Sequence, residues 1–115
     1  MNDALAGMMG LCRRAGKLAV GMTAVEGSLY KKRARVVFLD GRAARNTRRQ
    51  VEAMCTRANC PLCAVPENFL QDTLQRANTT VVAVEDVNFA SRMLALYQQM
   101  LQQENLQRQD HKDNQ

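Results

Sequence analysis

The segment that decides the fold spans residues 13–40 and reads RRAGKLAVGMTAVEGSLYKKRARVVFLD. Gly16 stands where a left-handed C-terminal cap would end a preceding helix, and a short apolar stretch at 18–20 follows it. Thr23 and Glu26 have the Thr-x-x-Glu spacing of a capping box, which predicts that the next helix begins near Thr23. The segment therefore opens with a helix end, an extended stretch and a second helix.

The second half of this segment joins a basic cluster to an apolar run. Lys31, Lys32 and Arg33 suit the end of the second helix, because cations interact favourably with the carbonyl end of a helix dipole. The run at 36–39, Val-Val-Phe-Leu, is β-branched and aromatic and has charged residues on both sides, so it predicts a buried strand. Helices and strands thus alternate within one segment.

The remaining elements follow outward from this segment. Four apolar residues recur at helical spacing near the start, Leu5, Met8, Met9 and Cys12, and predict a first helix of about ten residues. Downstream we expect a helix capped by Asn46 or Thr47 with an apolar stripe of Val51, Met54, Cys55 and Ala58, a strand over 61–65, a helix from Pro66 to about Arg76, a strand over 79–84, and a helix capped by Asp86 or Asn88 whose apolar face ends at Leu101.

This alternation predicts an α/β fold, a three-layer α/β/α sandwich in which helices cover both faces of a small mixed sheet of about four strands. A chain of 115 residues fits one core, and we expect one domain over 1–104. Beyond Glu104 the apolar period fades into a Gln, Asn and Asp-rich stretch, so 105–115 is expected to be a disordered polar tail.

The charge of the chain is concentrated in its first half. Residues 13–57 carry twelve lysines and arginines against three acidic residues, a net charge of +9, whereas the rest of the chain carries four basic and eight acidic residues. Such segregation is typical of a surface that binds phosphates, because each neutralised phosphate releases condensed counterions. The alternative is a basic face that only confers solubility. We favour nucleic-acid binding.

Several other classes of protein are not expected. No apolar run approaches the roughly 20 residues needed to span a bilayer. The first ten residues lack a basic leader, so a cytoplasmic protein is expected. A monomer is expected as well. The glycines are scattered and none forms a phosphate-binding loop after a strand, so a nucleotide-dependent enzyme has no support. His111 has no partner and Glu85 and Asp86 suit capping, so we expect no catalytic site.

The four cysteines, Cys12, Cys55, Cys60 and Cys63, are expected to be free thiols in a reducing compartment. The spacing Cys55-x4-Cys60-x2-Cys63 is also that of some metal sites, and Cys60-x2-Cys63 that of a redox pair. A zinc site would need Cys12 to fold back onto this segment, and Cys60 leads into a strand rather than a helix. We therefore expect no metal and no cofactor.

From about Leu5 to Leu101 the chain resembles the ribosomal L-seven-Ae / L-thirty-e superfamily, and most closely its small bacterial YlxQ-like members. The matching pieces are Arg14-Ala15-Gly16-Lys17-Leu18, Gly21 at the head of the second helix, the basic segment before Val36-Val37-Phe38-Leu39, Asn46-Thr47, Val81-Val82-Ala83-Val84 and Phe89-Ala90. The resemblance implies an α/β/α sandwich, in agreement with the pattern of elements.

The resemblance also implies binding to structured RNA, typically kink-turns, by a non-enzymatic protein of ribosomal or RNA-processing particles. The start of the second helix would meet sheared G·A pairs, and a loop after the fourth helix would close over an extruded nucleotide. Carried over by position, the first element is Gly21, Met22, Thr23, Ala24 and Gly27, and the second is Asn78, Thr79 and Thr80. The charge that would position phosphates lies at Lys17, Lys31, Lys32, Arg33, Arg42, Arg45, Arg48 and Arg49.

The chain departs from the family pattern at three of these positions. RNA-binding members often have Asn or Lys in place of Thr23, Glu or Gln in place of Ala24, and Lys in place of Gly27. The Ala24 side chain has no hydrogen-bonding group for a base edge, and Gly27 supplies no cation. These departures leave open a second hypothesis, a protein-interaction or assembly factor with weak, generic affinity for RNA.

Overall fold

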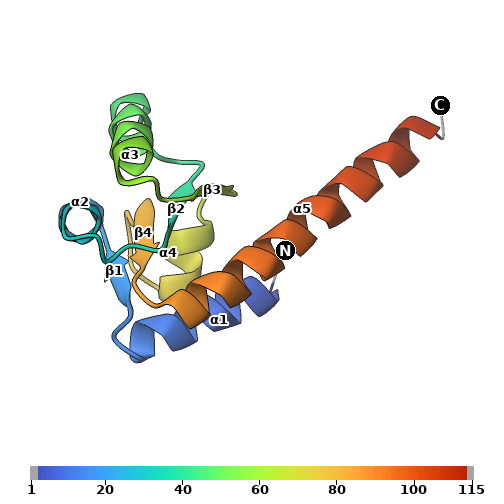
Figure 1. Cartoon of the computed structure of the whole chain (residues 1–115). Coiled ribbons are helices and arrows are strands. Elements are labelled where there is room, and N and C mark those ends of the chain that lie inside the picture. Colours follow the sequence, from blue (N-terminus) through green and yellow to red (C-terminus); the bar gives the residue numbers. More distant parts are fainter. Residues whose placement is uncertain (1–2, 114–115) are drawn as a thin grey trace.

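The computed structural model describes residues 3–113 (Figure 1). Its elements are α1 Asp3–Arg14, β1 Leu18–Val20, α2 Met22–Tyr30, β2 Val36–Asp40, α3 Arg45–Ala58, β3 Leu62–Val65, α4 Phe69–Leu74, β4 Val81–Val84 and α5 Val87–Asp113.

The strands form one mixed sheet in the order β1-β4-β2-β3. β4 is antiparallel to both β1 and β2, whereas β2 and β3 are parallel and are joined by α3. Val20 pairs with Val82 and Leu39 with Val81, so the C-terminal ends of β1 and β2 both meet the beginning of β4. This register brings loops that are distant in the sequence to one edge of the sheet.

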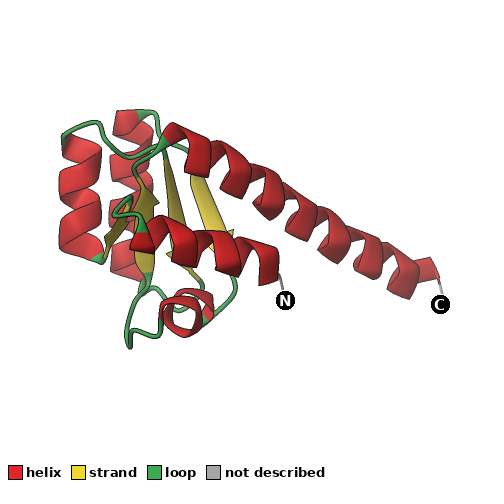
Figure 2. Cartoon of the chain, turned by 90° about the horizontal axis from the view of Figure 1, so that it is seen from below, coloured by secondary structure: helices red, strands yellow, loops and turns green. Residues whose placement is uncertain are grey.

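Helices cover both faces of the sheet, as predicted (Figure 2). One layer contains α1, α4 and α5, and the other contains α2 and α3. All five residues of β2 are buried because the strand lies between these layers. Val36 and Phe38 pack toward the first layer, and Val37 and Leu39 toward the second. The α/β/α sandwich expected from the sequence is thus confirmed.

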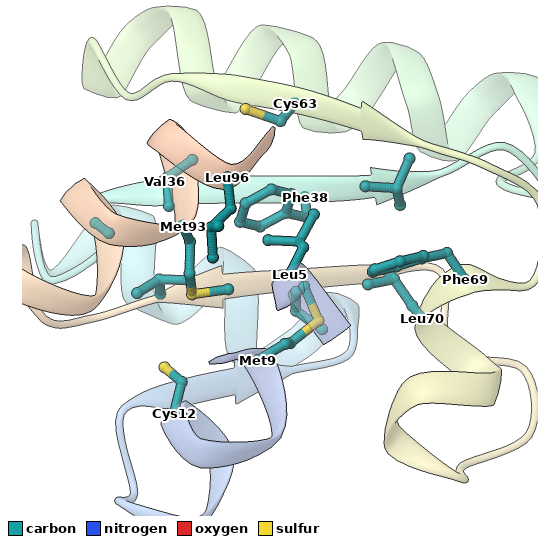
Figure 3. Close-up of a cluster of buried hydrophobic side chains, with 14 of the residues drawn as sticks. Leu5, Met9, Cys12, Val36, Phe38, Cys63, Phe69, Leu70, Met93 and Leu96 are labelled. Carbon is teal, nitrogen blue, oxygen red and sulfur yellow. The ribbon is translucent and has the colours of Figure 1, made fainter. Parts of the chain in front are cut away.

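Phe38 belongs to the larger of the two buried clusters, together with Leu5 of α1 and Leu96 of α5 (Figure 3). The ring of Phe38 meets that of Tyr97 edge to face, with the ring centroids 6.0 Å apart. Burying a phenylalanine of this kind contributes about 1.5–3 kcal/mol. Met9 and Cys12 complete the buried stripe of α1, as their helical spacing predicts.

Two helix ends follow the sequence prediction closely. After α1, Gly16 has φ 73°, and the backbone N–H groups of Gly16 and Lys17 bond to Arg13 and Cys12, at 3.0 Å each. These bonds form a Schellman motif, which requires the left-handed conformation that glycine adopts easily. At the start of α5, Asp86 Oδ2 accepts the N–H of Phe89 at 2.9 Å. Asp86 is therefore the cap.

The predicted capping box at Thr23 is wrong. α2 begins one residue earlier, and its N-cap is Gly21, with φ 92° and ψ 162°. The N–H of Gly21 still bonds to Val81 O at 3.0 Å as the last link of the β1–β4 ladder, so the chain turns from strand to helix within one residue. A non-glycine residue would be strained at this φ. Thr23 lies inside the first turn and is exposed.

The predicted caps of α3 are also wrong. The helix begins at Arg45 with Ala44 as an extended N-cap, which places Asn46 and Thr47 in the first turn. The preceding loop sets this start, because a tight turn in which the N–H of Ala43 bonds to Asp40 O at 3.0 Å brings Ala44 to the head of the helix. Ala58, expected in the apolar stripe, is exposed at the end of the helix.

The fourth helix is shorter than predicted. α4 covers six residues, and Asn68 and Gln75 flank it with φ 70° and 49°. Pro66 starts a turn before the helix, in which the N–H of Phe69 bonds to Pro66 O at 3.1 Å. Two strands are trimmed as well, to Leu62–Val65 and Val81–Val84.

α5 continues to Asp113, past the point where a tail was expected, and its later turns project beyond the sheet (Figure 1). The stretch after Glu104 contains neither proline nor glycine, and its glutamines, Leu106, Arg108 and Lys112 are good helix formers. The expected tail also includes residues 114–115, which lie outside the described part of the chain. Leu101, expected on the apolar face, is 38% exposed. Within residues 3–113, no helix combines the length and the apolar character needed to cross a membrane.

Candidate nucleic-acid interface

One edge of the sheet gathers four loops. The N–H of Gly21 bonds to Val81 O, the N–H of Asp40 bonds to Thr80 O at 2.8 Å, and the N–H of Gly41 bonds to Val65 O at 3.0 Å. These bonds hold together the loops β1–α2, β2–α3, β3–α4 and α4–β4. We call this side of the molecule, residues 21–24, 40–49, 65–68 and 78–81, the Gly21 edge.

Of the three described helices that start at the Gly21 edge, α2 and α3 carry predicted site residues in their first turns. In the described chain neither has a side-chain cap hydrogen bond, and neither has an acidic residue in its first turn. The first N–H groups of a helix have no acceptor within the helix and carry a partial positive charge. The edge therefore presents two sets of backbone donors to water or to an anionic ligand.

Three arginines add charge to the beginning of α3. Arg45 and Arg49 are exposed and Arg48 is half-buried. Next to them, at the start of α2, Met22 is half-buried and Thr23 is exposed. The structure thus brings the predicted residues at the start of α2 beside the predicted arginines of α3, along one edge of the sheet.

Asp40 holds this edge in place, a role that the sequence analysis missed. Its side chain is only 1% exposed. Oδ1 accepts the N–H groups of Arg42 and Asn68, both at 3.0 Å, and Oδ2 accepts the N–H of Leu70 at 3.1 Å. The carboxylate therefore ties the loop after β2 to the beginning of α4. The only sequence signal was an acidic residue at the end of a buried strand.

Arg42 has a structural role at the same edge. Its Nη1 donates to Asn68 Oδ1 at 2.9 Å and to Gln71 Oε1 at 3.2 Å. Gln71 Oε1 also accepts the N–H of Asn78 at 3.1 Å. Arg42, predicted as a phosphate contact, thus fixes the loop that carries Asn78.

The predicted nucleotide-binding loop, 78–80, presents its residues unequally. Asn78 is exposed and has φ 62°. Thr79 is 5% exposed, and its Oγ1 donates to Arg76 O at 2.9 Å, so its side chain faces the protein. Thr80 is half-buried, and its carbonyl group belongs to the sheet. Asn78 is therefore the member of this loop whose side chain is open to a ligand.

The predicted lysines lie at the opposite edge. Lys17 precedes β1, and its carbonyl accepts the N–H of Glu85 at 2.8 Å. Lys31 and Lys32 follow the C-terminus of α2, and both are exposed. The structure therefore divides the predicted basic residues into an arginine group at the Gly21 edge and a lysine group, with Arg33 beside Lys31, at the far end of α2.

A groove of about 370 Å³ runs along α2, and none of the three arginines at the beginning of α3 lines it. Ala24 and Gly27 lie in it, between Thr23 at one end and Lys31 at the other. The remaining lining residues are Ala19, Ser28, Arg33 and Glu85. Ser28 Oγ is buried, and within the described residues it has no hydrogen-bond partner. The methyl group of Ala24 and the absence of a side chain at Gly27 leave this groove open.

The cysteines of the considered zinc site do not come together. Cys12 and Cys63 are buried in the cluster under α1 and α5, where Figure 3 shows them well apart. Burial is the main cause that raises the pKa of each of these two thiols to about 11. Cys55 and Cys60 lie on the other side of the sheet, near α3. Among the described residues the four thiols therefore form no common metal-binding cluster.

No protein-family model matches the sequence, and no curated protein matches it. Among solved structures the chain is similar to a protein with unknown function from Bacillus halodurans C. The two have a TM-score of 0.77 and 22% sequence identity, over 83% of this chain and 97% of the other. At this level of identity the likeness shows a shared fold, and the chain has the α/β/α architecture of that protein.

Proposed function

We propose that this protein is a non-enzymatic binder of structured, kink-turn-like RNA, and that RNA docks on the Gly21 edge. The observation that carries the proposal is the meeting of two helix N-termini with Arg45, Arg48 and Arg49 at one edge of the sheet. Backbone donors, a fixed positive potential and arginine side chains are the groups that bind phosphates and position RNA. We also propose that the protein is a cytoplasmic monomer and that it associates with ribosomal or RNA-processing particles.

Gly21 has a specific role in this proposal. Apart from the two neighbouring residues in the chain, a Cβ at this position would meet no atom of the described protein within 4 Å, so the backbone is open on that side. An RNA backbone or base edge can therefore approach the first turn of α2 closely. Met22 and Thr23 would lie against the RNA, and Asn78 would contact a nucleotide from the adjacent loop.

The lysine group fits the same RNA. α2 has nine residues and is therefore about 13 Å long. Lys31 and Lys32 would meet the phosphates of a flanking stem while the Gly21 edge meets the bend. Because Ala24 and Gly27 offer no polar side chain between these points, recognition would depend on backbone shape and charge more than on base edges.

A titration tests the proposal directly. Full-length protein is titrated with a kink-turn RNA and with a straight duplex of equal length, at two salt concentrations. We expect tighter binding to the kink-turn. Replacing Arg48 and Arg49 with alanine should weaken binding to both RNAs and flatten the dependence of affinity on salt, by about 0.7–0.9 in the log–log slope for each phosphate that the variant no longer neutralises.

A matched control separates the site from bulk charge. Arg14→Ala with Arg92→Ala also removes two arginines, both exposed, but from α1 and α5. This control should change affinity and salt dependence much less. Equal losses in the two double variants would show that the Gly21 edge is not the binding surface. Weak, salt-sensitive and equal binding to kink-turn and duplex would instead favour the assembly factor with generic affinity for RNA.

A further inference from the structure

The C-terminus of α3 brings two cysteines together. Asn59 ends the helix in the left-handed conformation, with φ 54° and ψ 43°. The N–H of Asn59 bonds to Thr56 O at 3.2 Å, and the N–H of Cys60 bonds to Cys55 O at 2.9 Å. These bonds form a Schellman motif, which folds the residue after the cap back over the last turn of the helix. Cys60 therefore lies against Cys55.

The geometry of this motif is compatible with a bond between the two sulfur atoms. Fixed covalent bonds join the Cα of Cys60 to the donor nitrogen and the Cα of Cys55 to the acceptor oxygen of the backbone hydrogen bond. The two Cα atoms can therefore be at most about 7 Å apart, which is close to the upper limit for a disulfide. The two thiols also hydrogen bond to each other. Cys63, by contrast, points into the cluster on the opposite face of the sheet.

The two thiols have different electrostatic surroundings. The hydrogen bond from Cys55 lowers the pKa of Cys60, burial opposes this effect, and the positive charge of Arg35 lowers the pKa further. The same hydrogen bond, followed by burial, raises the pKa of Cys55. Cys60 is thus the thiol that ionises first. Cys60 Sγ also lies 3.7 Å from the carbonyl oxygens of Ala34 and Pro61, to which the thiol can donate.

The pair is accessible to a small molecule. Cys60 is half-buried rather than buried. Both cysteines line a cavity of about 530 Å³ whose other lining residues are Glu52, Thr56, Asn59, Pro61 and Leu62. Cys12 and Cys63 do not line it. A small oxidant can therefore reach this pair without entering the core.

We propose that Cys55 and Cys60 form a hydroperoxide-reactive dithiol in which Cys60 attacks and Cys55 resolves. The Cys60 thiolate attacks one peroxide oxygen, the O–O bond breaks, and Cys60 becomes a sulfenic acid. The oxygen attacked is the one that carries hydrogen, and the other oxygen leaves with the proton that Cys60 released on ionisation, as water from hydrogen peroxide or as an alcohol from an organic hydroperoxide. The Cys55 sulfur then attacks the Cys60 sulfur, and the S–O bond breaks. Water leaves with the Cys55 proton, so two thiols are oxidised to a disulfide and one hydroperoxide is reduced.

This site is independent of the proposed RNA interface. α3 has 14 residues, so its C-terminus lies about 20 Å from Arg45. If the protein fails to bind RNA, the proposed thiol chemistry is unaffected. If the thiols fail to react, the proposed RNA binding is unaffected.

Peptide mapping tests the proposal. The folded full-length protein is treated with hydrogen peroxide, free thiols are alkylated, and the protein is digested with trypsin without reduction. Cys55 lies in the tryptic peptide 50–57, and Cys60 lies in the peptide 58–76 together with Cys63. We expect these two peptides to become linked, with the loss of two hydrogen atoms, in the wild type and equally in Cys63→Ala. Cys55→Ala should instead accumulate a sulfenic acid on Cys60, which dimedone traps.

The peptide map of the wild-type protein can by itself overturn the proposal, and two variants identify the reacting thiols. Peptides 50–57 and 58–76 that stay unlinked while peroxide is consumed elsewhere would exclude the dithiol. Loss of the link in Cys63→Ala would show that Cys63 is the partner. In Cys60→Ala, confirmed as folded by circular dichroism, peroxide-dependent thiol loss should fall to the rate of a variant that lacks both Cys55 and Cys60. An unchanged rate would remove Cys60 as the attacking thiol.

Discussion

The two helical layers of the sandwich differ in what they bury and in what they expose. The layer of α1, α4 and α5 covers the larger cluster, which contains Phe38, Leu5 and Met93. The layer of α2 and α3 covers a smaller cluster of mainly short side chains, such as Val37 and Val51. The second layer carries the arginines of α3 and the groove of α2. Stability and the proposed binding surface therefore depend largely on different sides of one sheet.

The largest effect expected from this comparison concerns two neighbours on β2. Phe38→Ala removes a ring from the larger cluster and should lower the free energy of unfolding by about 3–5 kcal/mol. Val37→Ala, on the other face of the strand, should lower it by about 2 kcal/mol, because it removes two methyl groups from the smaller cluster. Urea unfolding measures both. Equal losses would mean that the two layers contribute alike.

The next effect concerns the residue that joins the loops between the layers. Asp40→Ala leaves three backbone N–H groups without their acceptor and should lower the free energy of unfolding by about 2–3 kcal/mol. Asp40→Asn keeps one acceptor oxygen and should lose less. If the proposed interface is right, RNA affinity of the folded alanine variant also falls, because the loops are no longer fixed. A variant as stable as the wild type would contradict the role of Asp40.

A third effect, on the pH dependence of stability, concerns the two thiols of the larger cluster, Cys12 and Cys63. Burial raises the pKa of Cys12 and Cys63 from 9.0 to about 11, so the folded state favours their neutral forms. This contribution to stability is full below the ordinary pKa and is lost as the pH rises from about 9 to about 11. The double variant Cys12→Ala, Cys63→Ala is expected to be less stable but to lose stability less steeply across this range. Parallel curves from urea unfolding would show that these thiols do not titrate on unfolding.

The smallest expected effect on the free energy of unfolding comes from removing a predicted helix cap, and one such cap lies in each helical layer. Thr23 makes no cap, so Thr23→Ala should change the free energy of unfolding by less than about 0.5 kcal/mol. Asp86 caps α5, and Asp86→Ala should cost about 1 kcal/mol. Thermal unfolding of the two variants measures the difference. A loss at Thr23 as large as that at Asp86 would restore the capping box.

Local sequence patterns were sufficient to predict most of the fold. The order of helices and strands, the buried run at 36–39, the end of α1 at Gly16 and the cap at Asp86 depend on residues near one another in the sequence. Helix starts were predicted less well. Gly21 and Ala44 are the N-caps of α2 and α3 because hydrogen bonds of the sheet and of the β2–α3 loop fix the chain there, and these bonds override side-chain preference.

The candidate site was predicted only in part, because its geometry depends on strand order. The sequence pointed to the start of α2 and to the arginines of α3, but the pairing of β4 with both β1 and β2 determines that they share an edge. The same pairing sends Lys17 to the other edge. The contact between Cys55 and Cys60 likewise required knowing that Asn59 ends α3 in the left-handed conformation.

The hydrogen bonds of Asp40 and Arg42 mean that the Gly21 edge is preorganised. The loop that leads to Arg45 and the loop that carries Asn78 are joined through Asp40, Arg42, Asn68 and Gln71 before any ligand arrives. A ligand that lands there does not have to order the loops, so little conformational entropy is lost on association. Binding at this edge would then be close to a rigid-body encounter, with an association rate governed by diffusion and by the positive charge of the arginines.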